Sequence, residues 1–91
     1  MKRVRVIISG RVQGVWYRGW TVDEATARGI DGWVRNRRDG TVEAVLSGPV
    51  ESVDAMIAAC WDGPLAAHVE AIQTFNDADP VDPGFCQLPS R

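Results

Sequence analysis

Histidine and cysteine are scarce in this chain of 91 residues, which contains one histidine and two cysteines. Cys60 and Cys86 form no CxxC motif and no Cys/His cluster, so the usual ligand sets of a structural zinc site are missing. The Gly-Lys-Ser or Gly-Lys-Thr ending of a nucleotide-binding P-loop is also missing. We therefore expect no metal, no cofactor and two reduced thiols.

Long hydrophobic runs are absent as well, although 45% of the residues are apolar. No stretch approaches the roughly 18 uninterrupted apolar residues that a membrane-spanning helix needs. The first residues, Met1–Val4, lead straight into an alternating pattern and show no apolar signal segment. From these features we expect a cytoplasmic protein of one domain, residues 1–91, with a modest core and no membrane partner.

The net charge of −2 is unevenly divided along the chain. Residues 1–48 carry nine Lys or Arg and five Asp or Glu, a net +4, whereas residues 49–91 carry one Arg and seven acidic residues, a net −6. The N-terminal half is therefore where an anion would be attracted. A nucleic-acid-binding domain would show a more extended basic face, so we expect no nucleic-acid partner.

The order of the expected elements predicts an α+β domain. Apolar periodicity, bounded by glycine and proline, indicates strands near residues 3–9, 30–36, 41–46 and 68–75, a short edge strand at 85–88, and helices over 19–28 and 50–61. A change of phase between Val69 and Ile72 indicates a bulge in the fourth strand. The order βαββαβ plus a short strand predicts the ferredoxin-like, split-βαβ sandwich, an antiparallel sheet with both helices on one face.

The loop after the first strand has features of an anion-binding site. Residues 10–17 contain two glycines and lead into a helix N-terminus, where unpaired N–H groups and the helix dipole favour an anion. Arg18 follows directly, and a cation at this end opposes the dipole by roughly 0.3–1 kcal/mol. A bound anion would reverse that cost, but on spacing alone a solvent-facing Arg18 is equally compatible.

Asn36 ends the second expected strand, just before the turn at residues 37–40. Asparagine is a common turn residue, and that explanation needs no function. An amide has no useful pKa, so a functional Asn36 would orient a ligand or water and could not act as a general base. His68 has no Ser or Cys nucleophile near it in any motif, and we expect a structural or surface role.

Two motifs in this region resemble those of the acylphosphatase family. Residues 10–18, Gly-Arg-Val-Gln-Gly-Val-Trp-Tyr-Arg, resemble the first signature, Gly-Arg-Val-Gln-Gly-Val-x-[Phe/Tyr]-Arg. Residues 32–36, Gly-Trp-Val-Arg-Asn, followed by Gly40, Val42 and Gly48, resemble the second. The resemblance covers nearly the whole chain and implies a metal-independent hydrolase of acyl phosphates.

The resemblance also implies the site residues and the partners. It gives the loop N–H groups and the side chain of Arg18 the role of holding phosphate, and Asn36 the role of positioning water. The phosphate cradle then consists of Gln13, Gly14, Val15, Trp16, Tyr17 and Arg18. The expected substrate is a small acyl phosphate, with inorganic phosphate as product and inhibitor, and we expect a monomer. Trp16 departs from the family pattern, which has a smaller residue or Phe there, and Arg28 stands where Leu is usual.

Two other functions remain open at this point. A non-catalytic anion-binding module could have the same fold and the same cradle, and only turnover distinguishes it from an enzyme. An RNA-recognition domain would need exposed aromatic residues on its central strands. The first strand instead offers Arg3, Arg5 and Ile7 on the relevant face.

Overall fold

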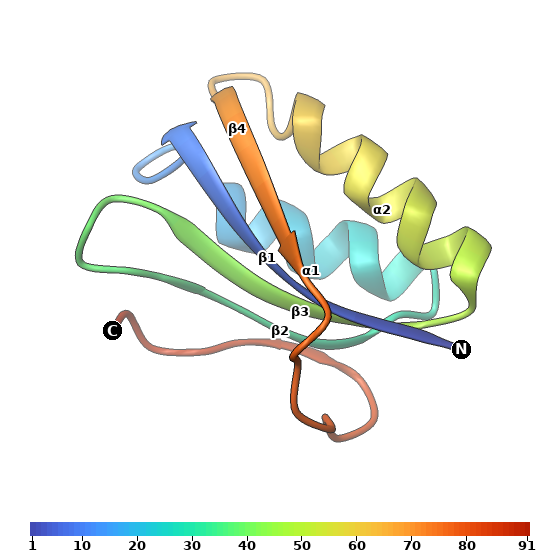
Figure 1. Ribbon diagram of the computed structural model, residues 1–91. Helices are drawn as coiled ribbons and strands as arrows, with labels where there is room; N and C mark the ends of the chain where they lie inside the picture. The colour runs from blue at the N-terminus through green and yellow to red at the C-terminus, as the bar shows by residue number, and fades with distance from the viewer.

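The structure, a computed structural model, describes residues 1–91 and consists of one sheet with two helices on one of its faces (Figure 1). The strands are β1 (Lys2–Arg11), β2 (Asp31–Asn36), β3 (Val42–Gly48), β4 (His68–Phe75) and β5 (Phe85–Gln87), and the helices are α1 (Tyr17–Ala27) and α2 (Val50–Asp62). This is the predicted ferredoxin-like α+β arrangement. Neither helix is long and apolar enough to cross a membrane.

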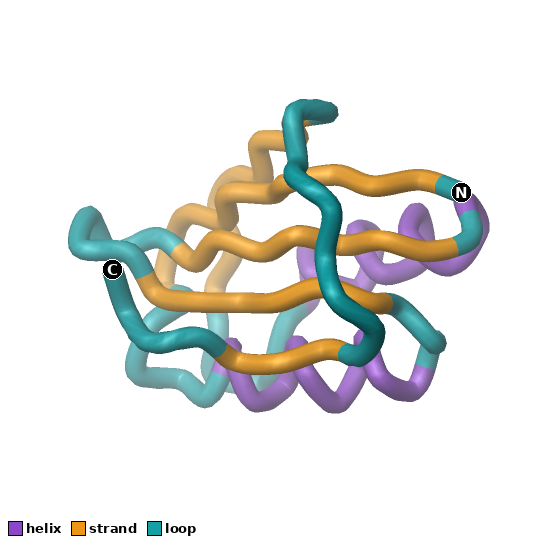
Figure 2. The backbone as a smooth tube through the Cα atoms, turned by 90° about the horizontal axis from the view of Figure 1, so that it is seen from below, coloured by secondary structure: helices purple, strands orange, loops and turns teal.

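The sheet has the order β4-β1-β3-β2-β5. The first four strands pair antiparallel as predicted, but β5 pairs parallel with β2, so the complete sheet is mixed. β4 and β5 occupy opposite edges of the sheet. The chain begins β5 at the same end of the sheet at which β4 stops, so β5 runs opposite to β4 and parallel to β2. Residues 76–84 cross the open face of the sheet between β4 and β5 (Figure 2). Arg3 and Arg5 hold this segment through hydrogen bonds to Ala78 and Asp77.

The core lies between the sheet and the helices and follows the alternation of apolar residues along the strands. Its fully buried members include Val4, Val6 and Ile8 of β1, Val42, Ala44 and Leu46 of β3, Val53, Met56 and Cys60 of α2, and Tyr17 and Ala25 of α1. Burial of each larger apolar side chain stabilises the fold by about 1.5–3 kcal/mol. Trp61 lies near the end of α2 on the helix's outer face and is 49% exposed.

The bulge predicted in the fourth strand is present next to the functional loop. Ser9 pairs with Ala71 and Gly10 pairs with Val69, so Glu70 is an extra residue on β4. A bulge increases the local twist and bends the strands. This bulge lies where β1 ends and the chain turns toward α1, so it bends the strands beside the functional loop.

Helix α1 begins two residues earlier than the sequence predicts, at Tyr17. Arg18 consequently lies in the first helical turn, where its backbone N–H is one of the unpaired donors. The helix ends at Ala27, and three backbone hydrogen bonds close its last turn: from Arg28 and Ile30 to Ala25, and from Gly29 to Thr26. This is the capping pattern expected when a glycine follows the last turn.

Candidate active site

A cavity of about 130 Å³ lies between the start of α1 and the end of β2. It brings together Arg18 and Asn36, the two residues predicted to carry the chemistry. Five of the six residues predicted for the cradle line it, whereas Val15 packs against the core instead. The complete lining is Val12, Gln13, Gly14, Trp16, Tyr17, Arg18, Gly19, Asn36 and Gln87.

The loop and the first helical turn contribute a run of unpaired hydrogen-bond donors. The backbone N–H groups of residues 13–19 donate no hydrogen bond within the protein. Trp20 is the first residue of the helix whose N–H is paired, to the carbonyl of Trp16 at 3.1 Å. Unpaired donors at a helix N-terminus, combined with the helix dipole, favour an anion.

Two residues of the loop have a left-handed backbone conformation. Gly14 has a φ of 72°, in the left-handed region that costs glycine little. Trp16 has a φ of 65° and is the one residue other than glycine with a positive φ. A left-handed conformation costs a bulky residue about 1–2 kcal/mol, and strain of this kind often marks a functional site.

Arg18 is half-buried at the cavity, and its guanidinium lies within 4.0 Å of no carboxylate. The positive end of the α1 dipole adds to its charge rather than offsetting it. The site therefore presents positive charge that no carboxylate within 4.0 Å neutralises. A guanidinium can donate two parallel hydrogen bonds to phosphate oxygens, which a point charge cannot do.

Asn36 reaches the cavity from the last position of β2. Because side chains alternate along a strand, it shares the helix-covered face with the buried Val34. Its side-chain oxygen, Oδ1, is buried and accepts no hydrogen bond. An unpaired buried acceptor costs about 1–3 kcal/mol, so this atom is set up to accept a donor from a ligand or a water.

Gln13 joins the two halves of the site. Its side-chain nitrogen, Nε2, donates 2.8 Å hydrogen bonds to the carbonyls of Arg37 and Thr41. These carbonyls lie on either side of the turn that follows Asn36. The side chain of Gln13 therefore holds the loop against the hairpin, while its backbone N–H remains among the unpaired donors.

Tyr17 anchors the start of α1 and does not present its phenol to the cavity. The ring is 1% exposed, and the hydroxyl donates a hydrogen bond to the carbonyl of Cys60 on α2. Burial raises the pKa of the Tyr17 phenol far above its usual value, with the adjoining Cys60 as a second cause. Only the backbone of Tyr17 is therefore available to an anion. Burial also raises the pKa of the Cys60 thiol, to about 11.

Three further residues line the cavity that the sequence did not predict as site residues: Val12, Gly19 and Gln87. Gly19 lies close to the indole of Trp16, so a Cβ there would displace the ring. Gln87 reaches the site because β5 lies parallel to β2, with Gln87 opposite Val34. No signal in the sequence indicated that pairing, so Gln87 could not have been found from sequence.

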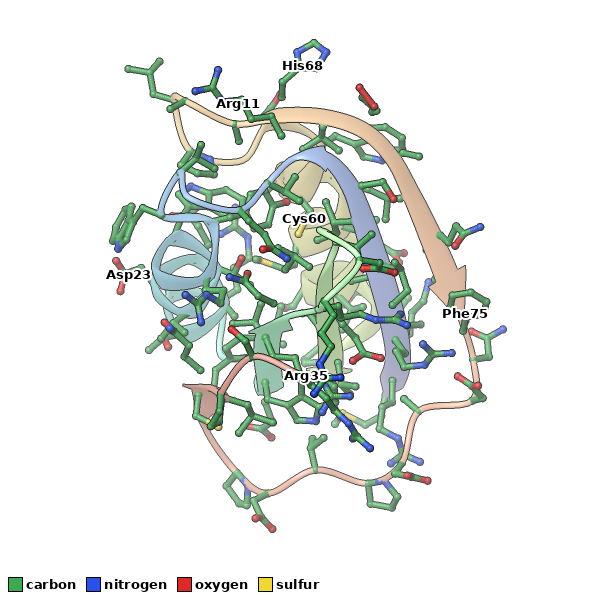
Figure 3. All side chains as sticks on the ribbon, turned by 90° about the vertical axis from the view of Figure 1, so that its left-hand side faces the viewer. Arg11, Asp23, Arg35, Cys60, His68 and Phe75 are labelled. Atoms are coloured by element: carbon green, nitrogen blue, oxygen red, sulfur yellow. The ribbon has the colours of Figure 1, made fainter.

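The other charged candidates lie outside the cavity. Arg35 points to the open face of the sheet and pairs with Glu43, Nη2 to Oε1 at 2.6 Å; Glu43 is only 6% exposed and also pairs with Arg5. His68 is exposed and points outward from the start of β4, beside Arg11 (Figure 3). The chain contains no group of three or more His, Cys, Asp or Glu side chains that could hold a metal ion.

The fold and the cavity define the class: an α+β protein of the ferredoxin-like fold whose first helix presents unpaired donors and an unpaired arginine. Comparison with known proteins narrows this class to one family. The family model for acylphosphatase matches residues 4–86, which is nearly the whole chain. The chain belongs to the acylphosphatase family, as its two motifs predicted.

Individual relatives agree with this assignment. The chain is 56% identical over 90 residues to an acylphosphatase of Rhodospirillum rubrum, with 99% of each chain covered. It is 57% identical over 83 residues to an acylphosphatase of Azorhizobium caulinodans, covering 90% of this chain and 89% of that one. The crystal structure of acylphosphatase from Bacillus subtilis matches with a TM-score of 0.91 at 32% identity, over 97% of this chain and 99% of that one.

Proposed function

We propose that this chain hydrolyses acyl phosphates to a carboxylate and inorganic phosphate. In this proposal Arg18 and the loop N–H groups hold the phosphoryl group, and Asn36 orients the attacking water. One observation carries the proposal: unpaired N–H donors, an unpaired guanidinium and an unpaired buried amide oxygen meet in a single cavity of about 130 Å³. Each of these groups lacks a partner that a phosphoryl group and a water would supply.

Binding depends on the oxygens of the phosphoryl group. The N–H groups of residues 13–19 are unpaired, and all of these residues except Val15 line the cavity together with the side chain of Arg18, so several oxygens can be contacted at once. Charge-assisted hydrogen bonds of this kind are about twice as strong as neutral ones. Because the donors are held by the loop and the helix, little reorganisation is needed as charge on the phosphoryl group redistributes.

The attacking water is placed by Asn36. A water that donates one hydrogen to Oδ1 of Asn36 keeps an oxygen lone pair free to face phosphorus. Its oxygen forms the new bond to phosphorus as the bond from phosphorus to the acyl oxygen breaks. The electron pair leaves on the carboxylate, and a phosphoryl oxygen takes the proton of the water, because Asn36 cannot accept it.

The leaving group explains why so few residues suffice. A carboxylic acid has a pKa of roughly 4, so the carboxylate leaves near neutral pH without a proton donor or a metal. Positioning and electrostatic stabilisation then supply most of the catalysis. Phosphate monoesters leave as much more basic alkoxides, and we expect them to be poor substrates. We further propose that residues 1–91 act as one domain, as a cytoplasmic monomer.

The alternative is a module that binds anions through the same cradle without turnover. Release of benzoate from benzoyl phosphate by the purified chain separates the two, with Arg18→Ala as the test variant and Arg11→Ala as its control. Arg11 is exposed and outside the cavity, so its replacement makes the same charge change without touching the cradle. We expect turnover that inorganic phosphate inhibits competitively and that Arg18→Ala lowers by roughly 10²–10⁴ in kcat/KM. Phosphate binding with no turnover would favour the module.

A further inference from the structure

The cavity is too small to enclose a whole substrate with a bulky acyl group. Its volume of about 130 Å³ is well below the roughly 300–1,000 Å³ of pockets that enclose drug-sized ligands. The groups that converge on it are donors suited to a phosphoryl group. The acyl group of a bound substrate must therefore extend out of the cavity and lie against its rim.

The rim offers one apolar surface. Of the nine residues that line the cavity, only Gly14, Trp16 and Gln87 are exposed. Gly14 has no side chain and Gln87 is polar. The apolar residues Val12 and Tyr17 are buried, each 1% exposed. Trp16, at 65% exposed, is the only exposed apolar side chain among the residues that line the cavity.

The indole of Trp16 lies beside the start of α1. The left-handed backbone at Trp16, with φ 65° and ψ 25°, directs the side chain back over the first turn of α1. There the indole lies against Gly19, so closely that a Cβ on Gly19 would collide with its Nε1, Cε2 and Cδ1 atoms. The ring therefore forms an exposed apolar surface beside the first turn of α1, two residues before Arg18.

We propose that the indole of Trp16 forms an acyl-group subsite that favours acyl phosphates with an aromatic or large apolar acyl group. The inference rests on the proposed function, because the phosphoryl group must occupy the cavity. In benzoyl phosphate the ring lies two bonds beyond the oxygen attached to phosphorus, which brings it to the rim. Stacked or tilted contacts between aromatic rings stabilise a complex beyond the effect of buried area alone.

Binding of two inert phosphonates tests the subsite without requiring turnover. Benzylphosphonate and methylphosphonate share the anionic group and differ in the ring. Calorimetric titration of the unmodified chain should give a Kd about five- to tenfold lower for benzylphosphonate. Trp16→Ala should reduce this ratio to about twofold or less, and Trp16→Phe should retain most of it. Trp61→Ala, which removes an exposed tryptophan outside the cavity, should leave the ratio unchanged.

Equal affinities of the unmodified chain for the two phosphonates would overturn the subsite, as would an undiminished ratio in Trp16→Ala. Hydrolysis provides the parallel measurement, in which Trp16→Ala should lower kcat/KM for benzoyl phosphate more than for acetyl phosphate. A preference for benzylphosphonate in a chain without turnover would contradict the proposed function and leave the subsite standing. Turnover without a preference for benzylphosphonate would support the proposed function and overturn the subsite.

Discussion

The side-chain amide of Gln13 donates a 2.8 Å hydrogen bond to the carbonyl of Thr41 and a second to the carbonyl of Arg37. One side chain of the loop thus fixes the hairpin that follows Asn36 relative to the helix turn that carries Arg18. The sequence predicted Gln13 as part of the phosphate cradle, and its backbone N–H fits that role. Its side chain also joins the two segments that carry the catalytic candidates, Arg18 and Asn36.

Gln13→Ala should therefore lower kcat more than it raises KM. In the variant, the carbonyls of Arg37 and Thr41 each lose one hydrogen-bond donor. Each lost hydrogen bond costs about 0.5–1.5 kcal/mol of stability. Small displacements of a positioned water reduce the rate strongly, and we expect a loss of about tenfold in kcat. Urea unfolding and steady-state kinetics measure the two effects, with Gln73→Ala on exposed β4 as the control. A rise in KM alone would show that Gln13 only binds phosphate.

Arg18→Ala should lose both binding and rate. Removing one partner of a charge-assisted, bidentate contact costs about 2–5 kcal/mol, which corresponds to roughly 10²–10⁴ in kcat/KM. Arg18→Lys should recover only part of this, because an ammonium lacks the planar fork. Steady-state kinetics with benzoyl phosphate provide the values. If Arg18→Ala stays within threefold of the unmodified chain, phosphate is held in another way.

Activity should survive a strong chelator. In the mechanism proposed, the carboxylate leaving group needs no Lewis acid. The guanidinium of Arg18 supplies the positive charge that stabilises the phosphoryl oxygens. Rates of acyl phosphate hydrolysis before and after dialysis against EDTA should agree within error. Loss of activity in EDTA and its recovery on addition of a divalent cation would replace this mechanism with a metal-dependent one.

The two cysteines should differ sharply in reactivity. Both are free thiols, with Cys86 exposed and Cys60 buried in the core. Thiolate is the reactive form, and burial raises the pKa of Cys60 to about 11, so it stays protonated at pH 8. A thiol reagent at pH 8 should modify one thiol per chain quickly and the second only on unfolding. Fast modification of both thiols in the folded protein would contradict this assignment of Cys60 to the core.

Much of the fold was predictable because its signals are local. The alternation of Val4, Val6 and Ile8, the glycine loop and the Asp-Gly turn each specify their own segment, and the bulge at Glu70 showed as a change of apolar phase. The start of α1 was predicted two residues too late. Tyr17 packs into the core and Trp16 takes a left-handed conformation, and neither feature is a usual signal for the start of a helix.

Non-local relationships could not be predicted from the sequence. The parallel pairing of β5 with β2 depends on residues 76–84 crossing the open face of the sheet, and a three-residue strand carries no sign of its partner. Gln87 enters the cavity only through that pairing. The amide of Gln13 similarly finds its acceptors across the loop, since carbonyl positions depend on the assembled backbone.

The kinetics of Asn36→Ala test the central claim most directly. If the amide orients water and does not hold phosphate, it acts mainly in the transition state. We expect kcat for benzoyl phosphate to fall by about 10²–10³ with KM nearly unchanged. The free energy of unfolding should not decrease, because the variant removes a buried acceptor that has no partner. Asn36→Asp should be no better than Ala, because it places a negative charge beside the phosphoryl group. Near-normal kcat in Asn36→Asp would instead make residue 36 a general base, and an unchanged kcat in Asn36→Ala would remove it from the mechanism.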